Sequence, residues 1–300
     1  MRPLRIFYTD RYTVELPAGH RFPMSKYRLV REALVREGLL RESELVEPEL
    51  PGRDVIALAH TRAYVDALCD GTIDPRAMRK IGFPWSPALV TRSLASVGGA
   101  LAAAEEALLT GVSGNLAGGT HHAQADAGEG YCVFNDLAVV VKHLLATGHV
   151  ERVAIVDLDV HQGNGNAAIL AGTPQCFVFS MHGAKNFPFR KVPSTLDVAL
   201  DDGAGDEEFL AALDAHLPRA LAFEPDLVLY QAGVDPLHED TLGRLSMSLE
   251  GLRERDRRVL LACRRAGVPV SLALGGGYAD PIALTVEAHV GTYRMVREVF

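Results

Sequence analysis

"VAIVDLDVHQG", residues 153–163, joins a short apolar run to two aspartates and a histidine. Its first four residues are all apolar and do not alternate with polar ones, which predicts a strand covered on both faces, as in a parallel sheet. Asp157 continues this run, where an unpaired charge would be costly to bury. We therefore expect Asp157, Asp159 and His161 to face a functional site at the carboxyl end of the strand.

Other apolar runs have the same character, and helical patterns separate them. The predicted strands cover residues 153–159, 176–181, 226–233 and 268–277. The predicted helices cover residues 25–38, 93–111, 135–148, 206–223 and 250–267. This alternation predicts an α/β fold with a central, mostly parallel sheet and helices on both faces. We expect residues 185–205 to form a long surface loop and residues 1–300 to form one domain.

The composition is that of an ordinary globular protein, with 48% hydrophobic and 23% charged residues among 300. The net charge of −8 and the lack of a basic run argue against nucleic acid as a partner. We expect no membrane partner, because no uncharged apolar run is long enough to span a bilayer. The four cysteines form no C-x-x-C pair and no signal peptide is evident, so we expect reduced thiols in a cytoplasmic protein. The oligomeric state is left open.

Polar side chains also follow the other apolar runs. "NLAGG" leads to His121 and His122, "LVLYQAGV" leads to Asp235, and "SLALGGG" leads to Tyr278. Because the carboxyl ends of parallel strands meet at one edge of a sheet, we expect these side chains to converge. Each of these polar residues, taken alone, could have a purely structural role; an aspartate after a strand, for example, often caps the next helix. Together, carboxylates, imidazoles and a phenol indicate a metal site with an added hydroxyl.

These motifs resemble the histone deacetylase superfamily, which has the arginase/deacetylase fold. The resemblance covers nearly the whole chain and is carried by "GGTHHAQADAGEGYCVFND", "VDLDVHQGNG", "FSMHG", "QAGVDPLHEDTLGRLSMSLEGL", "LALGGGY" and "HTRAYV". "DLDVHQGNG" and "GRLSMSLEGL", with the short chain, look most like class IV deacetylases. The resemblance implies a zinc-dependent amidohydrolase that removes acyl groups, acetyl or longer, from lysine side chains of proteins or peptides.

The resemblance implies one Zn²⁺ per chain, held by Asp159, His161 and Asp235. Two carboxylates and one imidazole suit zinc, and three protein ligands leave a position open for water and substrate. Zinc lowers the pKa of a bound water to about 7, which makes a nucleophile at neutral pH. By the same resemblance, His121 and His122 are the base and acid that move protons to and from the reacting groups.

Further roles follow from the same resemblance. Tyr278 is implied to donate a hydrogen bond to the tetrahedral oxyanion, and Asp157 to accept one from His121. Asn164 stands where many members have an aspartate that pairs with the second histidine. An amide orients His122 but does not stabilise its cation as a carboxylate does. Which histidine acts as the base is therefore left open.

A structural K⁺ is also implied. Its ligands would come from Asp157, Asp159, His161, Ser180 and Met181. For His182, which follows this group, we expect a structural role. Tyr131 and Phe187 match aromatic walls of a narrow acyl-lysine channel.

Three alternatives stay open. A small N-acyl amine, such as an acetylpolyamine, is the main alternative substrate, although no loop insertion that would narrow the channel is evident. An arginase-like manganese enzyme needs ligands for a metal pair, and this chain has those for one metal. The third alternative is a non-catalytic binding module. The loop 82–90 carries Phe83 and Trp85, which could line apolar space for a longer acyl chain or could simply pack against the core. We expect activity toward medium or long acyl chains at least equal to that toward acetyl.

Overall fold

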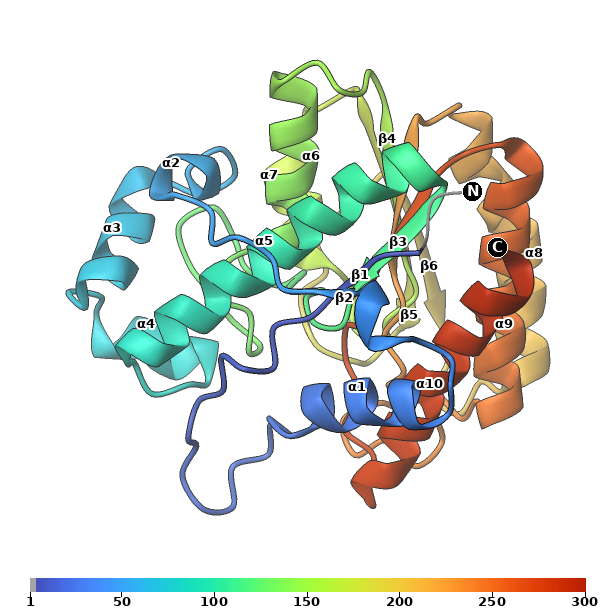
Figure 1. Cartoon of the computed structure of the whole chain (residues 1–300), viewed down its shortest axis with the longest axis horizontal. Helices are drawn as coiled ribbons and strands as arrows, with labels where there is room; N and C mark the ends of the chain where they lie inside the picture. Colours follow the sequence, from blue (N-terminus) through green and yellow to red (C-terminus); the bar gives the residue numbers. More distant parts are fainter. Residues whose placement is uncertain (1–3) are drawn as a thin grey trace.

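The computed structural model describes residues 4–300 and is built around one parallel sheet (Figure 1). Eight strands lie in the order β2-β1-β3-β8-β7-β4-β5-β6, and every neighbouring pair is parallel. The strands are β1 Ile6–Phe7, β2 Leu45–Val46, β3 Val112–Asn115, β4 Val153–Asp157, β5 Cys176–Gly183, β6 Leu196–Leu200, β7 Leu227–Gln231 and β8 Val270–Ala273. The predicted α/β fold with a central parallel sheet is confirmed.

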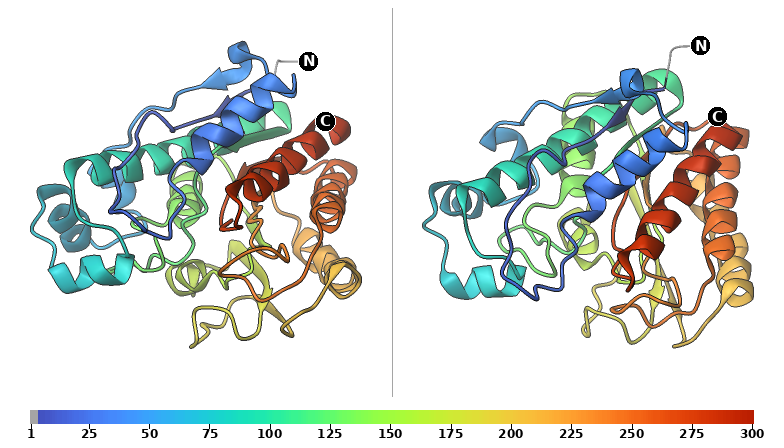
Figure 2. Two further views of the ribbon diagram at one scale, coloured as in Figure 1. Left: turned by 90° about the horizontal axis from the view of Figure 1, so that it is seen from below. Right: turned by 60° about the horizontal axis from the view of Figure 1, so that its bottom comes forward.

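Helices cover both faces of this sheet (Figures 1 and 2). They are α1 Lys26–Arg36, α2 Arg53–Ile56, α3 Arg62–Asp70, α4 Pro75–Ile81, α5 Pro87–Thr110, α6 Asp136–Ala146, α7 Asn164–Leu170, α8 Asp206–Ala222, α9 Leu249–Ala266 and α10 Ile282–Val299, with a 3₁₀ turn at Glu42–Glu44. On one face, Gly99 of α5 packs against Asn115 of β3. On the other, Gly114 of β3 packs against Tyr293 of α10. Helix α10 also packs against α9 and α1, and α9 against α8.

Strand β4, which ends at Asp157, is an inner strand of this sheet. All five residues of β4 are buried, between β7 on one side and β5 on the other. Helices on both faces explain why the run is apolar without alternation. Strands β3, β7 and β8 are also buried throughout, although β3 (VSGN) and β8 (VSLA) include polar residues.

The prediction of one long loop over residues 185–205 is wrong at its C-terminal part. There β6 pairs in parallel with β5, Ser180 opposite Asp197. Residues of β6 alternate between covered and exposed positions, as expected for an edge strand. It therefore lacks the continuous apolar run by which the inner strands are predicted.

Two further differences concern boundaries. The loop expected over residues 82–90 ends early, because Ser86 caps α5 by accepting a hydrogen bond from the Leu89 N–H. Strands β1 and β2 have only two residues each, which is too short for a periodic pattern. Within residues 4–300, no helix has both the length and the apolar character needed to cross a membrane.

Candidate active site

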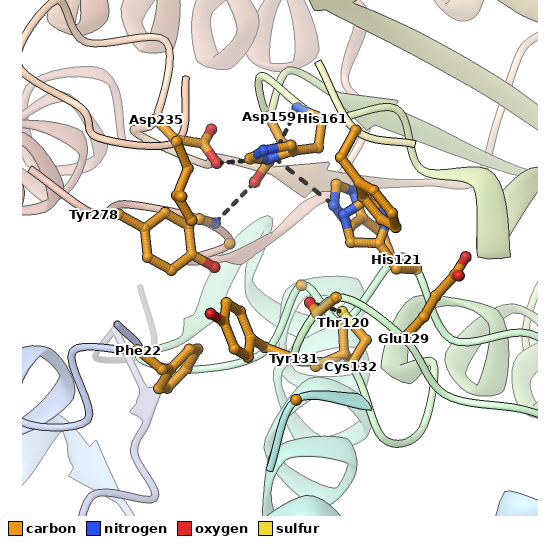
Figure 3. Close-up of a pocket in the computed structure, with 18 of the residues that line it drawn as sticks. Phe22, Thr120, His121, Glu129, Tyr131, Cys132, Asp159, His161, Asp235 and Tyr278 are labelled. Carbon is orange, nitrogen blue, oxygen red and sulfur yellow. Dashed lines mark hydrogen bonds and ion pairs between the residues drawn. The ribbon is translucent and has the colours of Figure 1, made fainter. Parts of the chain in front are cut away.

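The carboxyl ends of the inner strands open into a cavity of about 880 Å³ (Figure 3). The predicted site residues that line it are His121, His122, Tyr131, Asp159, His161, Phe187, Asp235 and Tyr278. They come from loops after β3, β4, β5, β7 and β8. The structure therefore brings together side chains that are up to 157 positions apart in the sequence, between His121 and Tyr278.

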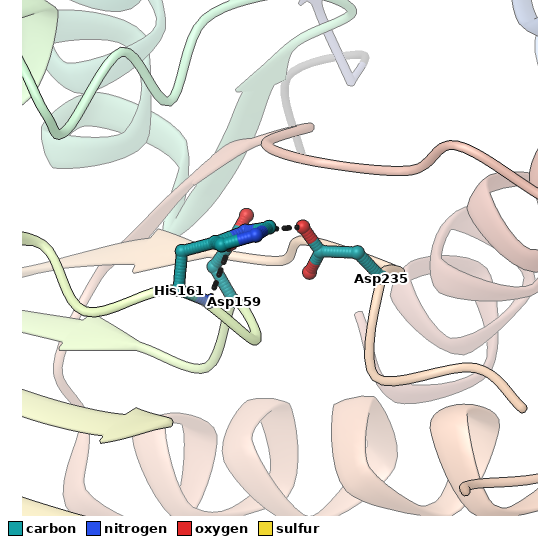
Figure 4. A group of neighbouring side chains, drawn as sticks. All are labelled: Asp159, His161 and Asp235. Atoms are coloured by element: carbon teal, nitrogen blue, oxygen red, sulfur yellow. Dashed lines mark hydrogen bonds and ion pairs between the residues drawn. The ribbon is translucent and has the colours of Figure 1, made fainter. Parts of the chain in front are cut away.

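Asp159, His161 and Asp235 form a compact, buried group whose side chains point toward one another (Figure 4). Their nearest ligand atoms all lie within 4.8 Å of one another. His161 Nδ1 is 3.1 Å from Asp159 Oδ1 and 3.0 Å from Asp235 Oδ2. Backbone N–H groups hold both carboxylates, from Gly276 to Asp159 Oδ2 at 2.8 Å and from Val160 to Asp235 Oδ1 at 2.8 Å.

The buried carboxylates of Asp159 and Asp235 require a nearby positive charge. Burial, together with the charge of Asp159, raises the pKa of Asp235 to about 7. Burial alone would lower the pKa of His161, but the two carboxylates outweigh it and raise that pKa to about 10. Two buried carboxylates this close are stable only with a proton or a cation between them. Two oxygens and one imidazole nitrogen suit Zn²⁺, so these residues fit the expected ion.

Glycine allows the loop after β8 to approach this group. A Cβ on Gly276 would lie 1.9 Å from Asp235 Oδ2 and 2.9 Å from Asp159 Oδ2. Any other residue would therefore displace the two carboxylates. The glycine run before Tyr278 thus serves the close packing of the candidate metal site.

His121 and His122 lie side by side, with ring centroids 4.2 Å apart. They do not follow β3 directly, because β3 ends at Asn115 and a turn intervenes. Gly118 and Gly119 take φ values of 81° and 78° in this turn, a region that favours glycine. Asp136 stabilises the turn by accepting hydrogen bonds from the N–H groups of Gly119 and Thr120, at 2.7 and 2.8 Å.

The two histidines have different partners. His121 Nδ1 lies 2.7 Å from Asp157 Oδ2, and His122 Nδ1 lies 2.7 Å from Asn164 Oδ1. Burial lowers the pKa of His121, but Asp157 and Asp159 outweigh it and raise the pKa to about 9. Burial, with His121 and His161 nearby, holds the pKa of His122 well below its usual value. The surroundings therefore favour the cation at His121 and the neutral ring at His122.

Tyr278 lies across the cavity from the histidines, with its hydroxyl directed into the open space (Figure 3). Its backbone is clamped on both sides by the segment after Asp235. The Tyr278 N–H donates to Asp240 Oδ2 at 2.6 Å, and Thr241 Oγ1 donates to the Tyr278 carbonyl at 2.8 Å. Burial, with Asp235 and Asp159 nearby, raises the pKa of the phenol well above its usual value. The hydroxyl therefore stays protonated and able to donate.

Aromatic rings form the wall of the cavity. Phe187 stands nearly perpendicular to His122, at 83° with ring centroids 4.9 Å apart. Tyr131 lies 6.2 Å from Tyr278 and 5.1 Å from Phe22, measured between centroids. Phe22 also lines the cavity but is absent from the sequence prediction. It precedes α1, far from any motif, so only the fold reveals its place.

Of the two roles left open for Phe83 and Trp85, lining this cavity does not apply, because neither residue is part of its wall. Phe83 is 3% exposed and packs edge-on against Phe22, with centroids 4.9 Å apart. The Trp85 indole donates to the Leu68 carbonyl at 2.8 Å. Both rings line a neighbouring cavity of about 560 Å³, which shares Gly82 with the first cavity.

The candidate potassium ligands gather where β4 and β5 end. Asp157 and Ser180 are partners in register, and both are buried, as is Met181. Asp157 Oδ1 accepts a hydrogen bond from the Asp159 N–H at 3.2 Å, and Ser180 Oγ lies 3.0 Å from His182 Nδ1. Burial lowers the pKa of His182 to about 4, which suits the structural role expected for it.

Two residues of the site have no part in the sequence prediction, although both lie inside quoted motifs. Asp240 accepts hydrogen bonds from the N–H groups of Leu242, Gly243 and Tyr278. Glu129 Oε1 accepts one from Asn164 Nδ2 at 2.6 Å. Acidic residues are common in loops, so neither stands out before the contacts are known.

Comparison with known proteins identifies the family of this chain. The histone deacetylase domain family matches residues 20–292. An uncharacterized protein of Picosynechococcus sp. is 44% identical over 296 residues, covering 98% of this chain and 99% of that protein. Histone deacetylase 2 of Arabidopsis thaliana is 34% identical over 196 residues, covering 63% of this chain and 50% of that enzyme. A probable deacetylase of Methanothermobacter thermautotrophicus is 32% identical, with 60% of its length covered.

Solved structures give the same result at the level of the fold. The crystal structure of a histone deacetylase homologue complexed with SAHA superposes with a TM-score of 0.83 at 28% identity, covering 98% of this chain and 84% of that one. The homologue from Aquifex aeolicus gives a TM-score of 0.81 at 27% identity. On the extent of these matches, the chain belongs to the histone deacetylase family.

Proposed function

We propose that this protein is a zinc-dependent amidohydrolase that removes acyl groups from lysine side chains. One observation carries the proposal: a buried Asp-His-Asp group, two partnered histidines and a tyrosine hydroxyl share one cavity. Membership of the histone deacetylase family and relatives named as deacetylases support a hydrolytic deacetylase. Zinc as the metal and acyl-lysine as the substrate are our proposals.

Asp159, His161 and Asp235 would hold the zinc ion. When bound, zinc would supply Lewis acidity toward the acyl carbonyl and lower the pKa of water. Burial and the charge of Asp159 raise the pKa of Asp235, which supports the proposal that these carboxylates bind a cation. The backbone N–H groups of Gly276 and Val160 keep their oxygens in place before any ion binds.

The two histidines then have separate tasks. His122 is neutral, and its Nδ1 faces Asn164, so Nε2 is the atom that accepts a proton from the attacking water. The protonated ring can return that proton to the leaving amine. His121 would serve as the second proton-handling group, since Asp157 pairs with its Nδ1 and favours its cation over the neutral ring. This assigns the general base to His122.

Tyr278 would donate its hydroxyl proton to the developing oxyanion. The donor is preorganised, because Asp240 and Thr241 clamp its backbone and neighbouring aromatic rings hold the side chain. A donor fixed before the reaction has no reorganisation cost at the transition state. Tyr131 and Phe187 would flank the apolar stem of the lysine side chain.

The charge of the lining favours acyl-lysine over an acetylpolyamine. Its lysine, arginine and glutamate residues are five bases and one acid: Arg21, Lys80, Arg92, Lys185, Arg244 and Glu129. A polyamine carries ammonium groups, which this lining repels. In the described residues a single Asp-His-Asp group could hold a metal, which disfavours a two-manganese enzyme.

The test is a comparison of kcat/KM for an acetyl-lysine peptide and for N-acetylputrescine with the zinc-loaded enzyme. We expect the peptide to be at least tenfold better. Raising the salt concentration should narrow the difference, because salt screens the basic lining. A preference for the acetylpolyamine would replace acyl-lysine by a small-molecule substrate.

A further inference from the structure

Behind His122 runs a chain of two hydrogen bonds that ends in a carboxylate. His122 Nδ1 lies 2.7 Å from Asn164 Oδ1, and Asn164 Nδ2 donates to Glu129 Oε1 at 2.6 Å. Glu129 belongs to the loop between the histidine pair and Tyr131 and lies at the cavity, on the same side as the histidines (Figure 3). Glu129 has no part in the metal site, in proton transfer or in stabilising the oxyanion.

The position of Asn164 is fixed by tight backbone packing at the start of α7. The N–H of Gly165 donates to the His121 carbonyl at 2.9 Å. A Cβ on Gly165 would lie 2.3 Å from the Ala123 carbonyl oxygen, so the start of α7 packs directly against the histidine loop, with no room for a larger side chain. What the backbone leaves undetermined is which end of the Asn164 amide faces His122.

The donor and acceptor requirements of Glu129 determine which end of the Asn164 amide faces His122. An amide has one end that donates and one that accepts, whereas an ionised carboxylate only accepts. Glu129 therefore requires the NH₂ end of Asn164, and the amide oxygen must then face His122. That oxygen accepts only, so His122 Nδ1 must carry the hydrogen, and Nε2 keeps its lone pair.

We propose that Glu129 is a positioning residue that fixes the Nδ1–H tautomer of His122 through the Asn164 amide. The inference deepens the proposed function, since that function requires an unprotonated Nε2. Without Glu129, either end of the amide could face the ring, and the flipped amide would demand the opposite tautomer. The flipped form would leave Nε2 protonated and unable to accept a proton from water.

The adjoining backbone supports the same arrangement. Gly130 has a φ of 56°, and a Cβ there would lie 2.7 Å from Cδ2 of His122. The segment that carries Glu129 thus passes directly against the imidazole. His121 needs no such relay, because Asp157 accepts from its Nδ1 directly.

The test measures the tautomer of His122 directly by NMR. In ¹⁵N-histidine-labelled, zinc-loaded protein, the Nδ1 and Nε2 shifts of His122 should report a single Nδ1–H form. Glu129→Gln should replace it by a mixture, because a glutamine amide can donate as well as accept, and kcat should fall roughly tenfold with little change in KM. Asp126→Asn is the matched control: it removes a charge from the same loop, at an exposed position, and should change neither.

A double variant tests whether the pattern of donors and acceptors, rather than Glu129 itself, sets the tautomer. Asn164→Asp alone places two carboxylates where the structure has a 2.6 Å hydrogen bond, so it should impair the enzyme. Asn164→Asp combined with Glu129→Gln restores an acceptor for His122 and a donor for residue 164, so the single tautomer and most of kcat should return.

A single Nδ1–H form in Glu129→Gln, with kcat within twofold of wild type, would overturn the inference. So would failure of the double variant to recover the tautomer while its spectrum shows a folded protein. Because the tautomer is read without turnover, an enzyme that shows it but hydrolyses no acyl-lysine would refute the proposed function and leave the inference intact.

Discussion

Replacing Tyr278 by phenylalanine removes one hydroxyl from the candidate active site and little else. The ring keeps its neighbours, with Lys26 Nζ 5.2 Å from its centroid and the Phe22 and Tyr131 centroids each 6.2 Å away. The clamp by Asp240 and Thr241 acts on the backbone and is unaffected. No hydrogen bond of the hydroxyl itself is formed within residues 4–300. The variant should therefore fold and bind zinc as the wild type does.

The expected loss is in the chemical step. Removing one preorganised oxyanion donor costs about 10²–10³ in kcat, or about 3–4 kcal/mol. KM should change little, because the hydroxyl interacts mainly with charge that develops in the transition state. The assay is steady-state hydrolysis of an acetyl-lysine peptide, with zinc content measured on the same samples. A Tyr278→Phe enzyme with full zinc and a kcat within threefold of wild type would refute the reasoning.

Three further predictions follow from the same site. Asp159→Ala and Asp235→Ala should each lose zinc and activity, because two remaining ligands bind the ion poorly; full occupancy by elemental analysis would contradict the ligand assignment. In metal-free protein, the raised pKa of His121 (about 9) contributes stability that is present below about pH 6.5 and lost as pH rises through 9. The urea-unfolding free-energy difference between wild type and Asp157→Asn should therefore be larger at pH 6 than at pH 10, and equal differences would argue against the pair. For acyl chains, kcat/KM for octanoyl-lysine should at least equal that for acetyl-lysine, since each buried CH₂ contributes about 0.8 kcal/mol; a steady fall with chain length would reject this.

The sequence predicts the inner part of this fold well. Strands β4, β5, β7 and β8 are mostly apolar and do not alternate regularly with polar residues, because helices cover both their faces. The polar residues that end such runs are conspicuous, which is why Asp159 and Asp235 can be singled out without a structure. Strand β6 is missed because one of its faces is exposed, so its apolar residues alternate with polar ones.

What the sequence does not reveal are contacts between loops. Glu129 and Asp240 look like ordinary surface acids until the fold brings them to Asn164 and Tyr278. For Phe83 the sequence leaves two roles open, lining the site or packing, and only the fold shows that it packs against Phe22. In each case the role depends on where a side chain points in three dimensions, and local pattern carries no such information.

The most direct test of the account is a zinc titration of metal-free protein, followed by hydrolysis of an acetyl-lysine peptide. We predict that activity rises with added zinc and saturates at one equivalent per chain, as expected for the single group Asp159, His161 and Asp235. A protein that binds one zinc ion and still hydrolyses no acyl-lysine, or one that reaches full activity only with two manganese ions, would contradict it.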